Sequence, residues 1–107
     1  MPAEPLEADP FAALGDPQRR AIVQMLAGRD RSVQEIADSL PISRPAVSRH
    51  LRLLKEAGLV LDRAEGTRRW YSLHHQGAEI VASYMEQVWG EAANRFRMAA
   101  ENTKDSG

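Results

Sequence analysis

Two short amphipathic segments, separated by only two residues, constrain the fold of this chain more than any other feature of its sequence. The first segment covers residues 32–40 and opens with Ser32 and Glu35 at the spacing of a capping box, in which each side chain satisfies a free backbone N–H at the start of a helix. The second covers residues 43–57, and Ser43 can cap its first turn. We therefore expect two capped helices joined by a tight turn.

Each segment carries a single apolar stripe at helical spacing. The stripes consist of Val33, Ile36, Ala37 and Leu40 in the first segment and of Val47, Leu51 and Leu54 in the second. A second helix that is apolar on its inner face and basic on its outer face is typical of the helix-turn-helix motif, which presents that helix to the major groove of DNA. The two segments therefore predict a DNA-binding motif whose second helix begins at Ser43.

The outer face of residues 43–57 is the expected contact with double-stranded DNA. A rotation of about 100° per residue from the apolar stripe places on or beside that face Arg44, Pro45, Ser48, Arg49, Arg52 and Lys55. Arg49 is the first candidate for base readout, because an arginine can donate two hydrogen bonds to guanine in the major groove. A solvated basic face is the simpler interpretation for an isolated helix, but the capped helix before it and the basic hairpin after it favour DNA binding.

The remaining contacts divide between bases and phosphates. Ser48, Arg44 and Pro45 are further candidates for base readout, since small and polar side chains at the start of a helix allow close approach to base edges. Arg44 also suits a phosphate. The expected phosphate contacts are Ser43, His50, Arg52, Lys55 and Gln34. Charge matters more than geometry at a phosphate, so binding through these residues should weaken steeply with salt.

The period of the sequence changes to that of strands after Gly58. Residues 59–63 and 68–73 are rich in apolar or aromatic side chains and flank a glycine turn at residues 64–67, which predicts a β-hairpin. The tip of the hairpin carries the second basic element, made of Gly66, Thr67, Arg68 and Arg69. Such a tip can reach the minor groove or its flanking phosphates, so we interpret it as a wing. Arg63 can equally be explained as a solubilising surface charge.

Helix signals precede the two segments and follow the hairpin. Asp9-Pro10 and Asp16-Pro17 each set a capping carboxylate before a proline at the first helical position, which predicts a short helix and then a longer one reaching about residue 27. Beyond residue 76 the helical period returns in an apolar stripe. That stripe consists of Val81, Met85, Val88, Trp89, Ala92 and Phe96.

The last stripe offers more apolar surface than so small a domain readily covers by itself. We expect it to form a homodimer interface together with Phe11. Inward packing of the same helix is the alternative, and both arrangements can hold on different faces. A two-fold dimer would set two recognition helices about one DNA turn apart, which predicts an inverted-repeat operator.

The composition limits the other functions open to this chain. Its net charge is −1, but residues 44–69 hold seven basic and three acidic residues, a local charge of +4 that suits DNA. The sequence contains no cysteine, which excludes disulfides, thiolate metal sites and thiol redox sensing. It has no Gly-rich phosphate loop and no His-carboxylate cluster at useful spacing, so an enzyme is disfavoured and no cofactor is expected.

The length of 107 residues matches one compact domain. We expect this domain at residues 9–101, with flexible tails at residues 1–8 and 102–107. No apolar run approaches the roughly 20 residues that cross a bilayer, and the first residues lack the pattern of a signal peptide. These features predict a cytoplasmic protein that does not bind a membrane.

Four stretches of the chain together resemble the ArsR-type winged helix-turn-helix repressors, over roughly residues 9–96. They read DPQRRAIVQML, SVQEIADSL, SRPAVSRHLRLLKEAGLV and GTRRWYSL, and they are specific when they occur in this order. The resemblance implies a mainly α-helical fold with a small β-hairpin, in the order α-α-α-α-β-β-α, and a homodimeric repressor that binds an operator. It assigns Ser43, Arg44, Ser48, Arg49 and His50 to the recognition helix and Gly66, Thr67 and Arg68 to the wing.

The chain departs from the metal sensors of that family, which carry a cysteine pair in the third helix or histidine and carboxylate ligands in the last. Residues 33–40 contain no cysteine, and the predicted last helix contains no histidine. The histidines are His50, His74 and His75, and adjacent histidines at the end of a strand point apart rather than toward one metal. We therefore expect no metal site and no metal or thiol sensing.

Two alternatives to this repressor stay open. The winged helix could dock a protein partner instead of DNA, although the basic outer face weighs against it. A small apolar ligand could also control a repressor from a pocket near the dimer helices, around Trp89 and Met85. The sequence does not identify such an effector.

Overall fold

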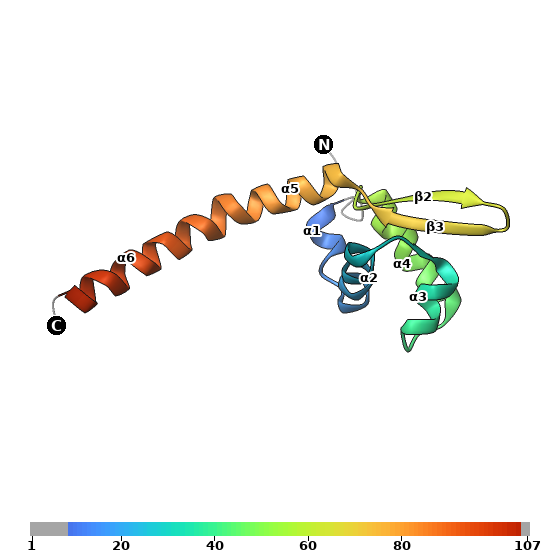
Figure 1. Cartoon of the computed structure of the whole chain (residues 1–107), viewed down its shortest axis with the longest axis horizontal. Coiled ribbons are helices and arrows are strands. Elements are labelled where there is room, and N and C mark those ends of the chain that lie inside the picture. The colour runs from blue at the N-terminus through green and yellow to red at the C-terminus, as the bar shows by residue number, and fades with distance from the viewer. Residues whose placement is uncertain (1–8, 106–107) are drawn as a thin grey trace, which may run out of the picture.

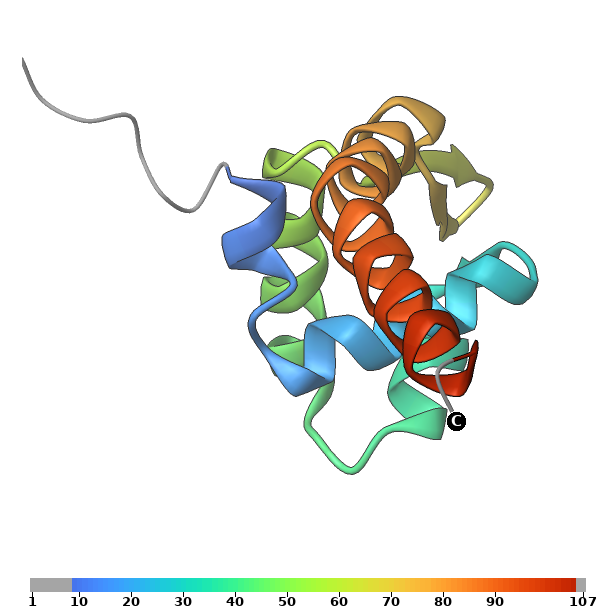
Figure 2. The same cartoon turned by 90° about the vertical axis from the view of Figure 1, so that its left-hand side faces the viewer.

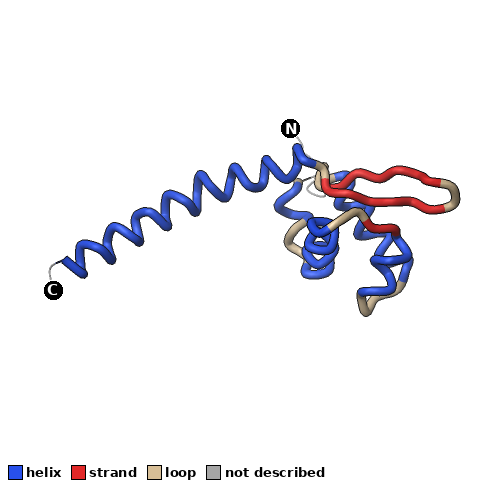
Figure 3. Tube along the Cα trace, viewed as in Figure 1, coloured by secondary structure: helices blue, strands red, loops and turns tan. Residues whose placement is uncertain are grey.

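The computed structural model describes residues 9–105, and the side chains of residues 9–101. Its elements are α1 (Pro10–Ala13), α2 (Pro17–Gly28), β1 (Arg31–Ser32), α3 (Val33–Ser39), α4 (Arg44–Glu56), β2 (Val60–Glu65), β3 (Arg68–Leu73), α5 (His75–Met85), a π-helical turn η2 (Glu86–Gly90) and α6 (Glu91–Asp105) (Figure 1). Helices dominate, and the strands form one small sheet (Figure 3). The predicted winged helix-turn-helix fold is confirmed, with β1 as an addition.

The predicted boundaries fit the structure unevenly. The tail expected at residues 1–8 lies outside the described residues, as do residues 106–107. Helix α6 runs to Asp105, four residues past the domain boundary that was expected at residue 101. The hairpin turn is also shorter than expected, because β2 runs to Glu65 and β3 begins at Arg68.

Polar caps start the helices where the sequence predicted them. Asp9, Asp16, Ser32 and Ser43 each accept a hydrogen bond from a backbone N–H two or three residues further along the chain. Glu35 completes the capping box, since its carboxylate accepts a hydrogen bond of 3.1 Å from the N–H of Ser32. These caps fix the start of α3 and of α4, and therefore the turn between them.

The core lies between the helices and the root of the hairpin. Its fully buried side chains are Ile22 from α2, Ile36 from α3, Val47, Leu51 and Leu54 from α4, and Val60 from β2. The stripe predicted for the second helix is thus confirmed as core. Because α4 is held along its whole inner face, its outer face is presented in a fixed orientation.

The three strands pair antiparallel in the order β1-β3-β2. In β1, Arg31 pairs with Tyr71 of β3, so the chain just before α3 is hydrogen-bonded to the wing. Gly66 adopts a φ of 63°, a left-handed conformation that suits glycine at the tip of a tight hairpin. The wing is therefore attached to both helices of the motif, through β1 on one side and through the segment after α4 on the other.

The C-terminal helical elements α5, η2 and α6 form one continuous rod that projects from the body on the side opposite the wing (Figure 1). Seen along its length, the rod crosses in front of the helical body (Figure 2). It makes the molecule elongated, with a radius of gyration of 18.3 Å, whereas about 13 Å is typical of a compact domain of about 100 residues.

The base of the rod rests on the turn that follows α4. Gly77, in the first turns of α5, is buried against Gly58, and a Cβ added at Gly77 would collide with the Gly58 carbonyl group. Gly58 itself has a φ of 78°, the left-handed conformation common after a helix. The next residue, Leu59, accepts a hydrogen bond of 2.9 Å at its carbonyl oxygen from the N–H of His74. The rod is therefore joined directly to the end of α4.

Candidate nucleic-acid interface

The outer face of α4 is exposed as the helical wheel predicted. Its exposed side chains are those of Arg44, Pro45, Ser48, Arg49, Arg52 and Lys55. The guanidinium group of Arg49 makes no hydrogen bond or ion pair with any residue that the structure describes, and the same holds for the guanidinium group of Arg68 in the wing. These two guanidinium groups are thus available to an outside partner without breaking an internal contact.

Polar side chains link the two helices of the motif at the edge of this face. The Arg44 guanidinium donates a hydrogen bond of 2.9 Å to the Oε1 atom of Gln34 in α3. Gln34 in turn donates one of 2.8 Å to the carboxylate of Asp38. The sequence placed Gln34 and Arg44 on the DNA side, and the structure brings their side chains together there.

A pocket of about 120 Å³ lies between α3, the start of α4 and the wing. It is lined by Ser32, Val33, Gln34, Arg44, Thr67, Arg68 and Arg69. The pocket thereby brings together residues that were predicted from separate parts of the sequence. They are the expected phosphate contact Gln34, the expected base contact Arg44 and three of the four expected wing residues. Its cationic lining suits an anionic group such as a phosphate.

Asp62 in β2 pairs with two of the cations that the sequence assigned to DNA. Its carboxylate lies 2.8 Å from the Lys55 ammonium and 2.7 Å from the Arg69 guanidinium. The hydrogen bond from Lys55, and then that from Arg69, holds the pKa of Asp62 below its usual value. The Asp62 side chain is only 10% exposed, so this ion-pair cluster fastens the end of α4 to the wing.

Asp62 is not among the site residues predicted from the sequence. The only signal in the sequence is that Asp62 is an acidic residue inside a strongly basic stretch. In the structure, the strand pairing places Asp62 across from Tyr71 of β3. Lys55 and Arg69 were counted there as free positive charges. In the structure, part of their charge is neutralised within the protein.

Arg63 braces the other side of the wing. Its guanidinium lies 2.9 Å from the Asp30 carboxylate and 3.4 Å from that of Glu65, and 6.0 Å from the centre of the Trp70 ring. Asp30 lies just before β1, so the contact ties the wing to the end of α2. Arg63 thus makes specific contacts and is more than a solubilising surface charge.

His50 faces the helical body. Its Nδ1 atom lies 3.3 Å from the Arg19 guanidinium of α2, and the side chain is partly buried. Burial lowers the pKa of His50, which favours the neutral imidazole. Arg19 also donates a hydrogen bond of 2.7 Å to the carbonyl oxygen of Ala13, at the end of α1. A phosphate contact by His50 stays a prediction, and its position favours packing.

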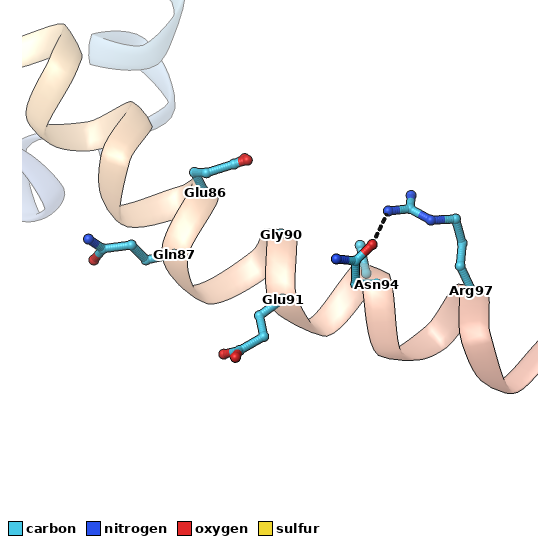
Figure 4. Close-up of a pocket in the computed structure, with 7 residues that line it drawn as sticks. Glu86, Gln87, Gly90, Glu91, Asn94 and Arg97 are labelled. Carbon is cyan, nitrogen blue, oxygen red and sulfur yellow. Dashed lines mark hydrogen bonds between the residues drawn. The ribbon is translucent and has the colours of Figure 1, made fainter.

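The rod displays the stripe that was predicted for dimerisation. Met85, Val88, Trp89 and Phe96 are exposed, whereas Val81 and Ala92 are partly buried. Phe11 packs against Tyr84 of the same chain, with 4.8 Å between ring centres. The other side of the rod is polar, and Arg97 donates a hydrogen bond of 2.6 Å to Asn94 there (Figure 4). The rod is therefore amphipathic outside the body of the protein.

Comparison with known proteins identifies the family. Residues 16–61 match the model described as bacterial regulatory protein, arsR family. The chain is 43% identical over 95 residues to the HTH-type transcriptional regulator Rv2034 of Mycobacterium tuberculosis, and the match covers 89% of each protein. The chain belongs to the ArsR family. It is thus a DNA-binding transcriptional regulator, and the prediction that it is not an enzyme is confirmed.

Other comparisons agree in sequence and in structure. The transcriptional repressor SdpR of Bacillus subtilis is 41% identical over 64 residues, covering 60% of this chain and 71% of that protein. The crystal structure of a possible transcriptional regulator for arsenical resistance superposes with a TM-score of 0.73 at 35% identity, covering 85% of this chain and 95% of that one. The superposition takes in the winged helix-turn-helix fold and most of the chain.

The structure also bears on metal binding and on membrane insertion by this ArsR-family chain. Among the described side chains, those of residues 9–101, no group of three or more histidine, cysteine, aspartate or glutamate residues is placed to hold a metal ion. His74 instead caps α5, where its Nδ1 atom accepts a hydrogen bond of 3.1 Å from the N–H of Gln76. None of the described helices is long and apolar enough to span a membrane.

Proposed function

We propose that this ArsR-family regulator is a repressor that binds an inverted-repeat operator as a homodimer, through residues 43–57 and the wing at residues 64–69. The observation that carries the proposal is α4, whose outer face is exposed while its inner face is fixed in the core. A helix held in this way can enter the major groove without rearrangement. The wing supplies a second basic contact beside it.

Within this interface, Arg49 reads a base and Arg68 binds the minor groove or a phosphate. Both are exposed and unpaired among the described residues, so neither gives up an ion pair when DNA binds. Ser48, Arg44 and Pro45 are further candidates for base readout. The remaining proposed contacts are Ser43, His50, Arg52, Lys55 and Gln34 at phosphates and Gly66, Thr67 and Arg69 in the wing. Among these, Lys55 and Arg69 exchange part of their contact with Asp62 for DNA.

The homodimer forms through the exposed apolar stripe of the rod. In the helix that projects from the body, Met85, Val88, Trp89 and Phe96 are exposed and are not covered by any residue that the structure describes. Pairing two rods around a two-fold axis covers both stripes and orients the two α4 helices symmetrically. Successive major grooves on one side of DNA lie about 34 Å apart, so the operator is an inverted repeat with that spacing between half-sites.

The regulator works without metal or thiol sensing and forms one domain over residues 9–101. The absence of cysteine from the sequence supports the first part of this proposal. The contacts of β1, the wing and the base of the rod with the helical body support the second.

Footprinting on the DNA upstream of the gene, followed by fluorescence anisotropy on the protected site, tests this function. Arg49→Ala should reduce discrimination at one base pair by about 1–3 kcal/mol. Arg97→Ala is the matched control, because it removes the same charge from the polar side of the rod (Figure 4), in α6, which projects away from the body that contains α4 (Figure 1). Its DNA affinity and base preference should equal those of the parent.

The outcomes separate the competing functions. A protected inverted repeat, with a base preference that depends on Arg49, supports the dimeric repressor. A protected single half-site would contradict the dimer and leave DNA binding intact. No protection on any upstream DNA would contradict the repressor and favour a winged helix that docks a protein.

A further inference from the structure

The residues of the apolar stripe of the rod are arranged symmetrically along the sequence. The stripe is centred midway between Val88 and Trp89. Its residues form three pairs, and the two members of each pair lie at equal numbers of positions on either side of this centre. The pairs are Val88 and Trp89, Met85 and Ala92, and Val81 and Phe96. That midpoint falls inside the π-helical turn η2. The stripe therefore has the same spacing when it is read in either direction from its centre.

Such a spacing matches what a two-fold contact between identical helices requires. In an isologous interface, residue i of one copy meets residue j of the other, and j meets i. When two antiparallel rods cross at the midpoint, Met85 lies opposite Ala92 of the partner subunit, and Val81 lies opposite Phe96 of the partner subunit. Every apolar position of the stripe then faces another apolar position.

An apolar pocket lies at the end of this register. It has a volume of about 200 Å³ and is lined by Leu14, Val23, Leu59, Leu73, Ala78 and Val81. This volume is smaller than the roughly 300–1,000 Å³ typical of pockets that hold drug-sized ligands, and it suits a single large side chain. Phe96, which meets Val81 in the register described above, is 80% exposed in the isolated chain.

We propose that two copies pair as antiparallel rods that cross between Val88 and Trp89, and that Phe96 of the partner subunit fills the pocket beside Val81. This inference rests on the homodimer proposed above and specifies its register and its anchoring side chain. The pocket includes Leu59, whose N–H donates a hydrogen bond of 3.0 Å to Leu54 at the end of α4. Dimer formation thereby packs a partner side chain against the support of the recognition helix.

Disulfide trapping tests the register, because the chain has no cysteine of its own. The double variant Met85→Cys/Ala92→Cys should form a covalent dimer under mild oxidation. Each single variant should not, since equivalent residues seven positions apart along antiparallel helices are separated by about 10 Å, beyond the reach of a disulfide. Ser83→Cys/Asn94→Cys is the matched control, with the same symmetry about the midpoint but off the apolar stripe, and should stay uncrosslinked.

Sedimentation equilibrium tests the anchoring residue. Phe96→Ala should raise the dimer dissociation constant at least about 100-fold, because two phenyl rings leave apolar pockets in each dimer. Met98→Ala is the control, since Met98 is also a large exposed apolar residue of α6 (62% exposed) but lies off the stripe. It should change the constant by less than about threefold.

The results distinguish this inference from the proposed function. A monomeric parent protein at micromolar concentration would overturn both the homodimer and the register. A dimer that crosslinks only in the Ser83→Cys/Asn94→Cys control would show that the rods pair through another face, which would overturn the proposed contact and leave the homodimer standing. Trapping at 85 and 92 with an unchanged dissociation constant for Phe96→Ala would show that the pocket is open to another occupant, such as a small apolar ligand, and would refute the anchor.

Discussion

Replacement of Asp62 by asparagine removes the carboxylate that Lys55 and Arg69 share. Asparagine keeps the shape of the side chain, but it carries no charge to pair with the two cations. Hydrogen bonds to charged groups contribute about 1.5–3 kcal/mol each, and the loss of one partner of a fully buried ion pair costs about 3–5 kcal/mol. Lys55 and Arg69 are each 53% exposed and regain water, so the expected loss of unfolding free energy is only about 1–2 kcal/mol at pH 7.

The effect should depend on pH in a defined direction. The pKa of Asp62 is lowered in the folded state, so its stabilisation is complete above the unfolded value of about 3.9 and disappears as the pH falls through the folded pKa. Urea denaturation followed by circular dichroism at several pH values measures this. The parent and Asp62→Asn should differ at pH 7 and converge below about pH 4.

A control and a second measurement sharpen the test. Glu56→Gln breaks the exposed Arg52–Glu56 pair, which has a 3.9 Å separation, and should cost at most about 0.5 kcal/mol. In DNA binding, Asp62→Asn frees two cations and should steepen the salt dependence by about 1–2 in log–log slope. Equal stability of Asp62→Asn and the parent at pH 7, or a difference that is independent of pH, would refute the role given to this carboxylate.

Three further predictions follow from contacts described above. Arg52→Ala should reduce the log–log slope of DNA affinity against salt by roughly 0.9, and Lys55→Ala should reduce it by less, because Lys55 is partly neutralised inside the protein. Anisotropy titrations across salt concentrations measure both slopes. Equal slopes for the two variants would argue against that neutralisation. Ser32→Ala should lower the unfolding free energy by about 1 kcal/mol through loss of the capping box, as urea denaturation would reveal. Gly77→Ala should cost about 1–3 kcal/mol in the same assay because its methyl group meets backbone. Gly28→Ala should cost nothing, because its methyl group would meet only the Arg31 side chain, at an ordinary contact distance of 3.8 Å. Similar values for the two would contradict the close packing at Gly77.

Local patterns in the sequence were sufficient to predict the helices and their buried faces. Val47, Leu51 and Leu54 could be assigned to the core because helical spacing alone brings them onto one face. Strand β1 could not be found in this way, since Arg31 and Ser32 are too few to show a period. Their strand conformation comes from pairing with β3, which is a tertiary contact.

The candidate interface was predictable in its location but not in its internal pairing. Exposure of Arg49 followed from the helical wheel, because it depends only on the direction of the side chain from its own helix. The pairing of Lys55 and Arg69 with Asp62 depends instead on the distance between α4 and the wing. The same applies to His50, whose contact with Arg19 is set by the packing of α4 on α2.

The contact between Gly77 and Gly58 couples the position of the rod to that of the recognition helix α4. The base of the rod rests on the backbone directly after α4, so in the proposed homodimer the angle between the two rods would set the separation of the two recognition helices. A change in that angle that displaces each α4 by about 3.4 Å shifts it by one base pair along the DNA. An effector could thus release the operator by altering the crossing of the rods, without touching a residue that contacts DNA.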